Sequence, residues 1–212
     1  SNTDLHIPAA TSTQLESGGA AGLGITTDFD GDTFGTLGTA TAPDIGFDEF
    51  AGAGVDLTAP SISYSNLTNT TTTANRAFNA VVVTDASGVS GTAGTRPRVY
   101  YKRSTDGNVF NDNTSGTDGW KFAEANGATT PFDFTINYAL LNGGTGVSAG
   151  QTVQYFVVAQ DLAGTPNVGI NSGSFAAPPS SVALTGAAFP IGGTINSYLI
   201  ATPITGTKTV CA

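Results

Sequence analysis

The amino-acid sequence predicts an all-β protein in which short strands are joined by glycine-rich turns. Glycine makes up 28 of 212 residues and only 11% of residues are charged, against about 7% and about 25% in average soluble proteins. Methionine is absent, and lysine and glutamate are scarce, whereas threonine, valine, tyrosine and phenylalanine recur. The scarce residue types favour helices and the recurring ones favour strands. Several segments also alternate cleanly between apolar and polar residues, which argues against disorder.

The first three predicted strands cover residues 61–64, 77–84 and 98–103. The first follows a linker that ends at Pro60, because proline is tolerated where a strand begins. The second ends at the turn Asp85-Ala-Ser-Gly88, whose residue types favour a reversal of the chain. The third divides into two faces. One face carries Val99 and Tyr101, and the other carries Arg98, Tyr100 and Lys102.

Four more strands are predicted after a polar loop at residues 104–119. They cover residues 120–122, 132–138, 152–160 and 196–201. In the segment 132–138, apolar residues alternate strictly with polar ones, the pattern of a strand with one buried face. Residues 152–160 are apolar on both faces, which predicts a central strand. Seven short strands with regular turn signals predict an immunoglobulin-like β-sandwich.

Charge divides the chain into two parts near residue 57. The first 57 residues carry nine acidic side chains and no lysine or arginine, whereas the remaining 155 carry seven of each sign. We therefore expect an acidic segment at 1–57, a sandwich at 58–201, and a linker or the start of a further unit at 202–212. No basic face is available for nucleic acid. No apolar run approaches the roughly 20 residues that cross a membrane.

Four motifs of the sandwich part carry a resemblance to a known family. They are Thr58-Ala-Pro-Ser-Ile62, Val83-Thr-Asp-Ala-Ser-Gly-Val89, Arg98-Val-Tyr-Tyr-Lys102 and Val153-Gln-Tyr-Phe-Val-Val-Ala-Gln-Asp161. The series resembles an immunoglobulin-like module of large secreted, adhesin-like bacterial surface proteins of the type IX export pathway. The resemblance implies a spacer or a binding unit rather than a catalyst, by analogy of fold.

The acidic part resembles the closing stretch of a right-handed parallel β-helix in the same proteins. The motifs are Asp4-Leu-His-Ile7, Asp28-Phe-Asp-Gly-Asp32 and Pro43-Asp-Ile-Gly-Phe-Asp-Glu49, with Thr33-Phe34 where that pattern often has Arg-Pro. Gly206-Thr-Lys-Thr-Val210 resembles the opening of another β-helix. The resemblance implies the terminal coil of one β-helix, one sandwich and the start of the next, a repeat within a long array.

Acidic residues of the first part form a candidate calcium site. Asp28, Asp30 and Asp32 alternate, so in an extended segment their carboxylates point the same way and repel one another unless a cation offsets them. Asp44 and Asp48 are candidates to complete the site, because calcium takes 6–8 oxygen ligands. The alternative is an exposed turn in which each aspartate accepts backbone N–H groups.

Trp120, together with Tyr100 and Tyr101, forms a candidate sugar-binding platform, because aromatic rings pack well on the apolar faces of sugars. The alternative is a tryptophan in the core of the sandwich. Catalysis is not expected. His6 is the one histidine available for a triad or a metal centre. The adjacent Asp48 and Glu49 would point to opposite faces of a strand, which fits glycoside hydrolysis poorly.

These observations favour a non-catalytic structural or adhesive repeat module of a long extracellular bacterial surface protein or filament. The expected partners are neighbouring domains of the same protein, other copies of it, and surface glycans. The expected location is extracellular, at the cell surface. The alternative function is a carbohydrate-binding accessory domain of a polysaccharide-degrading β-helix enzyme, for which the platform around Trp120 would be the binding site.

Overall fold

The structure is a computed structural model that describes residues 7–22, 24–37, 42–46 and 48–203. It consists almost wholly of strands and loops, in agreement with the all-β prediction. The chain divides into two compact units, Ser1–Leu57 and Thr58–Ala212, here called unit 1 and unit 2. The division falls where the charge of the sequence changes. Among the described residues, no helix has the length and apolar character needed to span a membrane.

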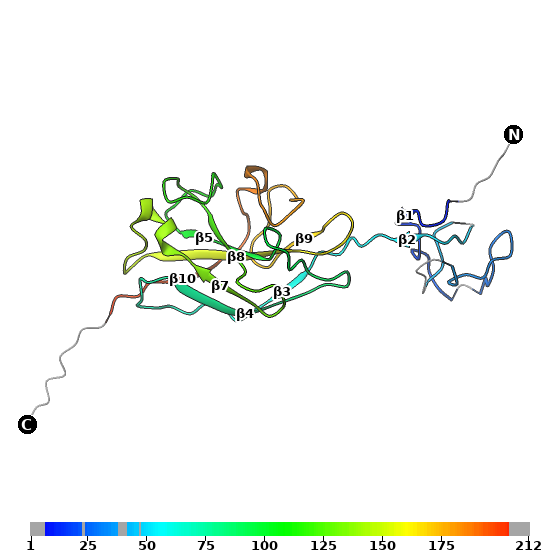
Figure 1. Cartoon of the computed structure of the whole chain (residues 1–212), viewed down its shortest axis with the longest axis horizontal. Helices are drawn as coiled ribbons and strands as arrows, with labels where there is room; N and C mark the ends of the chain where they lie inside the picture. The colour runs from blue at the N-terminus through cyan, green and yellow to red at the C-terminus, as the bar shows by residue number, and fades with distance from the viewer. Residues whose placement is uncertain (1–6, 23, 38–41, 47, 204–212) are drawn as a thin grey trace, which may run out of the picture. The chain divides into compact units, whose positions relative to one another are not determined.

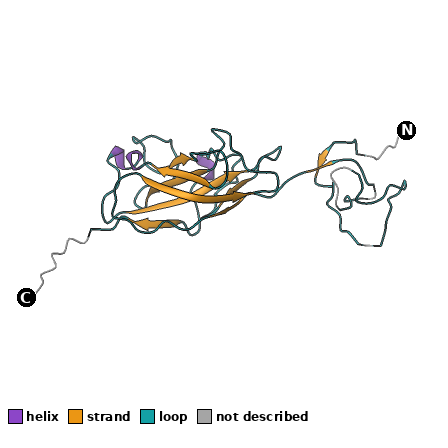
Figure 2. Ribbon diagram, turned by 60° about the horizontal axis from the view of Figure 1, so that its bottom comes forward, coloured by secondary structure: helices purple, strands orange, loops and turns teal. Residues whose placement is uncertain are grey.

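Unit 2 contains two antiparallel sheets that pack face to face (Figure 1). The smaller sheet has the order β3-β4-β7, from Ser61–Ser63, Arg76–Thr84 and Phe132–Ile136. The larger sheet has the order β10-β8-β5-β6, from Asn196–Leu199, Thr152–Gln160, Arg98–Arg103 and Lys121–Glu124. Strand β9 (Val168–Ile170) also pairs with β8. The short 3-10 helices are η1 (Tyr138–Leu140), η2 (Asn142–Gly144) and η3 (Gly186–Ala188), drawn in purple in Figure 2.

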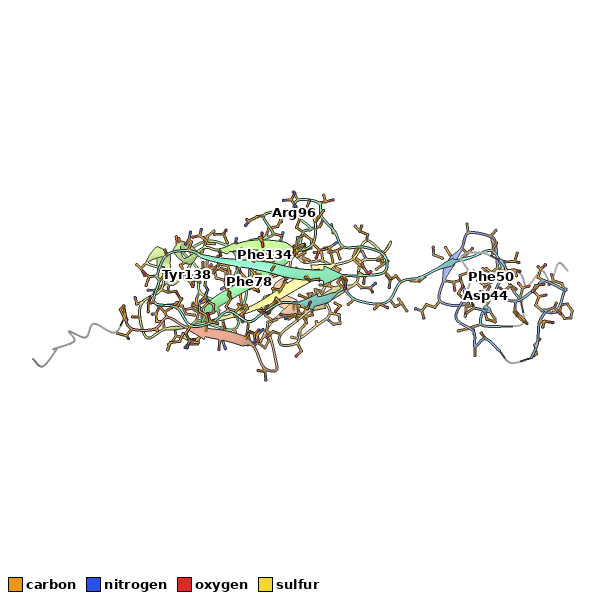
Figure 3. The ribbon with its side chains drawn as sticks, turned by 90° about the horizontal axis from the view of Figure 1, so that it is seen from below. Asp44, Phe50, Phe78, Arg96, Phe134 and Tyr138 are labelled. Carbon is orange, nitrogen blue, oxygen red and sulfur yellow. The ribbon has the colours of Figure 1, made fainter. Side chains whose placement is uncertain are left out.

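Aliphatic and aromatic side chains fill the space between the two sheets. In β7, Phe132, Phe134 and Ile136 are buried and the residues between them are exposed, as the alternation predicts. Phe134 lies beside Phe78 of β4 in the same sheet, with 6.0 Å between the ring centroids (Figure 3). Phe78 in turn packs edge-on against Tyr155 of β8 in the larger sheet, at 5.5 Å. Burying a side chain of this size contributes about 1.5–3 kcal/mol, so this layer holds the two sheets together.

A second apolar core covers the outer face of the larger sheet. Tyr100 of β5, Phe156 of β8 and Trp120 lie in this core, beneath apolar side chains of the segment 182–191. Both faces of the central strands are therefore buried, and every residue from Arg98 to Lys102 is buried. The central position of residues 152–160 is confirmed, since β8 has neighbours on both sides.

The chain enters unit 2 at one end of the sandwich and leaves it at the other (Figure 1). Ser61 of β3 pairs with Thr84, the last residue of β4. Tyr198 of β10 lies instead under the guanidinium group of Arg76, the first residue of β4, at 4.1 Å from the ring centroid. Strand β4 has nine residues, and a strand rises about 3.3 Å per residue. Ser61, at one end of β4, and Tyr198, at its other end, are therefore about 25 Å apart along the strand direction.

Unit 1 has little regular structure. Strands β1 (Ser12–Thr13) and β2 (Ala53–Gly54) form a short parallel pair. Residues 26–34 form a tight hairpin, in which the N–H of Asp28 donates to the carbonyl of Asp32 at 2.9 Å. Phe50 is the large apolar residue that the described part of unit 1 buries. Apolar burial is therefore small here. The motif expected at 206–210 lies outside the described residues, as does most of the motif at 4–7.

Candidate functional site

In unit 1, buried carboxylates hold the loops together by accepting hydrogen bonds from backbone N–H groups. Asp44 is 4% exposed, and its two oxygens accept the N–H groups of Ser17 at 2.6 Å and Phe50 at 3.0 Å. Glu49 is 2% exposed and accepts the N–H groups of Gly35 at 2.6 Å and Asp44 at 3.1 Å. Figure 3 shows Asp44 and Phe50 side by side. Because a buried N–H without an acceptor costs about 1–3 kcal/mol, these carboxylates hold the loops of unit 1 in place.

Asp28 holds the acidic hairpin through both of its carboxylate oxygens. Its Oδ1 accepts the N–H groups of Asp30, Gly31 and Asp32 at 3.2, 2.9 and 2.8 Å. Its Oδ2 accepts the N–H of Glu49 at 2.9 Å. These hydrogen bonds, first the one from Glu49, lower the pKa of Asp28 from 3.8 to about 2. The carboxylate is therefore ionised at neutral pH. It accepts the backbone N–H groups of the turn, as in the alternative that the sequence left open.

Three of the five predicted metal ligands lie together. Asp28, Asp30 and Asp48 bring carboxylate oxygens within 4.8 Å of one another. Asp32 and Asp44 are not part of this group. The alternation expected for residues 28–32 does not apply, because this segment is a tight turn and not an extended strand. Three carboxylates fit as part of a calcium site, with carbonyl groups and water as the remaining ligands.

The aromatic residues predicted to stack on sugars are buried. Trp120, Tyr100 and Tyr101 are each 0% exposed. Trp120 packs against Phe156, with 4.8 Å between ring centroids, and its Nε1 donates to Asn108 at 2.8 Å. Tyr100 lies in the same outer core, whereas Tyr101 lies in the core between the sheets. The predicted platform is therefore wrong for these three residues, because stacking on a sugar needs rings that solvent can reach.

Two lysines that the sequence analysis did not single out are buried, one near the end of β5 and one at the start of β6. Lys102 and Lys121 are 4% and 1% exposed. Lys102 Nζ donates to the carbonyl of Asp106 at 2.9 Å, and Lys121 Nζ donates to the hydroxyl of Thr117 at 2.7 Å. Burial lowers the pKa of both lysines, against an opposing effect of nearby aspartates. The signal in the sequence is that three of its seven cationic residues flank the loop 104–119.

Comparison of the chain with protein-family models, curated proteins and solved structures finds no match. Function is therefore inferred from the geometry and chemistry of the two units. His6, on which any histidine-based site would depend, lies outside the described residues.

Proposed function

We propose that the chain is a non-catalytic structural or adhesive repeat module of a long extracellular bacterial surface protein or filament. The observation that carries this proposal is that unit 2 receives the chain at one end of its sandwich and releases it at the other. Modules joined in this way would pass tension through each sandwich in turn. Neighbouring domains and other copies of the same protein are then the expected partners, as in other repeat arrays.

The first and last strands of unit 2 are well placed to resist stretching. Strand β3 is hydrogen-bonded to β4, and β10 to β8, in antiparallel ladders. A pull along the strands must break several of these bonds at once, whereas a pull across one end opens them one by one. The outer side of β10 is also tied. The N–H of Leu199 donates to Asn69 at 2.9 Å, and its carbonyl accepts the N–H of Thr70 at 3.0 Å.

Strand order supports an immunoglobulin-like assignment for unit 2. Immunoglobulin-like sandwiches place strands A, B and E in one sheet and strands G, F and C in the other, with C′ added in the variable type. The orders β3-β4-β7 and β10-β8-β5-β6 correspond to A-B-E and G-F-C-C′. The parallel pair of β1 and β2 in unit 1 supports, in the same way, the closing coil of a parallel β-helix.

The placement of cationic residues supports an extracellular location. Among the described residues, none of the six lysine and arginine side chains is exposed. Arg103, for example, pairs with Asp106, and Arg98 pairs with Glu124. Proteases with trypsin-like specificity need an accessible lysine or arginine, usually in a mobile loop. In the described part of the chain, the full or partial burial of these side chains suits a protein that meets proteases outside the cell.

We also propose that the group of Asp28, Asp30 and Asp48 takes up calcium. The ion would offset the mutual repulsion of the three carboxylates and tie the hairpin of residues 26–34 to the segment that carries Asp48. Calcium would thus stiffen unit 1, where apolar burial contributes little.

Distances between spin labels test the in-line arrangement of unit 2. Labels at Ser61→Cys and Thr202→Cys, in a Cys211→Ser background, should lie about 25 Å or more apart. The control pair Ser61→Cys and Thr84→Cys joins partners across β3 and β4, which are about 5 Å apart between Cα atoms. A first distance as short as the control distance would refute the arrangement on which the proposal rests.

A further inference from the structure

A small polar hollow opens near the end of unit 2 at which the chain leaves. It has a volume of about 200 Å³ and lies where residues 103–106, 115–121 and 140–143 meet. Backbone of left-handed conformation shapes its rim, since Asn142 and Gly143 have φ angles of 54° and 63°. Gly119 passes so close to Val109 that a Cβ there would lie 2.2 Å from the carbonyl oxygen. Asparagine and glycine both adopt the left-handed region readily, so these two residue types favour the turn that forms the rim.

The walls of the hollow carry two charges of each sign, from Arg103, Lys121, Asp106 and Asp118. Arg103 Nε donates to Asp106 at 2.9 Å. This ion pair holds both side chains in position. Asp118 is exposed at the rim, and Lys121 is buried below it. The two cations would repel a metal ion, and the two carboxylates would repel phosphate or sulfate. The balance favours a ligand without net charge that both donates and accepts hydrogen bonds.

We propose that this hollow binds one residue of a neutral glycan. The hydroxyl groups of a sugar ring can donate to carboxylates and accept from cationic groups, and such charge-assisted bonds are the strong ones. Leu140, which lines the hollow and is partly exposed, offers an apolar contact to the C–H groups of the ring. At about 30 Å³ per water, the volume holds roughly six or seven water molecules, which a single ring with its hydroxyls would displace.

This site goes beyond the tensile role of unit 2 and does not depend on it. It would let the module adhere to a glycan-coated surface, through residues different from the buried Trp120, Tyr100 and Tyr101. Only one ring is enclosed, so the affinity of a single module would be low. Repetition along a filament would raise the overall affinity, because linked sites bind at high effective concentration.

NMR titration of the full ¹⁵N-labelled chain with three methyl glycosides, those of β-D-glucose, β-D-galactose and α-D-mannose, tests the proposal. We expect the amide signals of Gly116, Gly119 and Gly143 to shift and to saturate at millimolar concentrations of at least one glycoside. Asp118→Asn should weaken binding by at least about fivefold, because a neutral hydrogen bond replaces a charge-assisted one. The fold should survive, because the new amide oxygen can still accept the N–H of Gly107, which now donates to Asp118 at 2.9 Å.

Asp133→Asn is the matched control, because Asp133 is also exposed and accepts one backbone N–H, that of Ala80 at 2.9 Å. It lies in β7 of the other sheet and should leave binding unchanged. Asn142→Gly is a second variant, since it keeps the left-handed backbone, removes the rim amide and should also weaken binding. The proposal is overturned if no glycoside shifts the three glycine signals, or if both rim variants bind like the unaltered chain. It is equally overturned if L-serine or inorganic phosphate shifts these signals more strongly than any glycoside.

Discussion

Asn108 ties the outer core of unit 2 together, and its replacement by alanine should destabilise the unit strongly. Its Oδ1 accepts the indole N–H of Trp120 at 2.8 Å and the N–H of Ile191 at 3.1 Å. Its Nδ2 donates to the carbonyl of Ile191 at 2.9 Å. One side chain thus links the covering segment 182–191 to the tryptophan beneath it.

The expected loss follows from these three hydrogen bonds. At about 0.5–1.5 kcal/mol for each bond, Asn108→Ala should cost about 1.5–4.5 kcal/mol of unfolding free energy. The upper half of this range applies, about 3–4.5 kcal/mol, because Trp120 is 0% exposed and its N–H would be left in an apolar core. Asn108→Asp keeps both acceptor bonds but places an anionic carboxylate oxygen against the carbonyl oxygen of Ile191, so its cost should be at least as large as that of the alanine variant.

Urea denaturation followed by tryptophan fluorescence measures these changes, since Trp120 is the one tryptophan of the chain. Asn126→Ala is the matched control, because the Asn126 amide makes a single long contact of 3.5 Å with Thr135 at the surface. The control should change stability by less than about 0.5 kcal/mol. If Asn108→Ala costs no more than the control, the covering segment is not held in the way described.

Three further predictions concern unit 1 and the surface. Asp44→Asn turns an NH₂ group toward one of two backbone donors, so the amide of either Ser17 or Phe50 should lose about 1–3 kcal/mol of protection from hydrogen exchange; unchanged protection of both would refute the role given to this carboxylate. Calcium should raise the melting temperature of unit 1 and a chelator should lower it, whereas calorimetry without any heat of binding would rule out the cation. Trypsin should leave residues 58–203 of the folded protein uncut, and rapid cleavage after Arg103, which precedes the loop 104–119, in native conditions would contradict the protected surface.

Most strands of unit 2 could be predicted from the sequence, because alternation is a local property. The predicted residues 98–103 and 152–160 coincide with β5 and β8, and the prediction 77–84 differs from β4 by one residue. Strand β9 and the covering segment were not predicted. Alternation shows which residues share a face of a strand, but it does not show what lies on that face. For this reason Trp120 could be read as exposed.

The roles of Asp44 and Glu49 could not be predicted, because their partners are distant in the sequence. Asp44 accepts a hydrogen bond from the N–H of Ser17, which lies 27 positions earlier, and Glu49 accepts one from Gly35, 14 positions earlier. Such contacts depend on the path of irregular loops, on which sequence spacing gives no information. The spacing of Asp28 suggested a cation. The turn around it supplies three backbone N–H donors, and the distant Glu49 supplies a fourth.

Single-molecule stretching of unit 2 tests the proposed mechanical role most directly. In the Cys211→Ser background, handles at Ser61→Cys and Thr202→Cys pull along the strands, and handles at Ser61→Cys and Thr84→Cys peel β3 from its partner β4. At about 3.4 Å per residue, full unfolding between the first pair lengthens the chain by about 450 Å. We predict that this length is released in one step, at a clearly higher force than the peeling step. Release at an equal or lower force, or in gradual steps, would contradict a role in bearing tension.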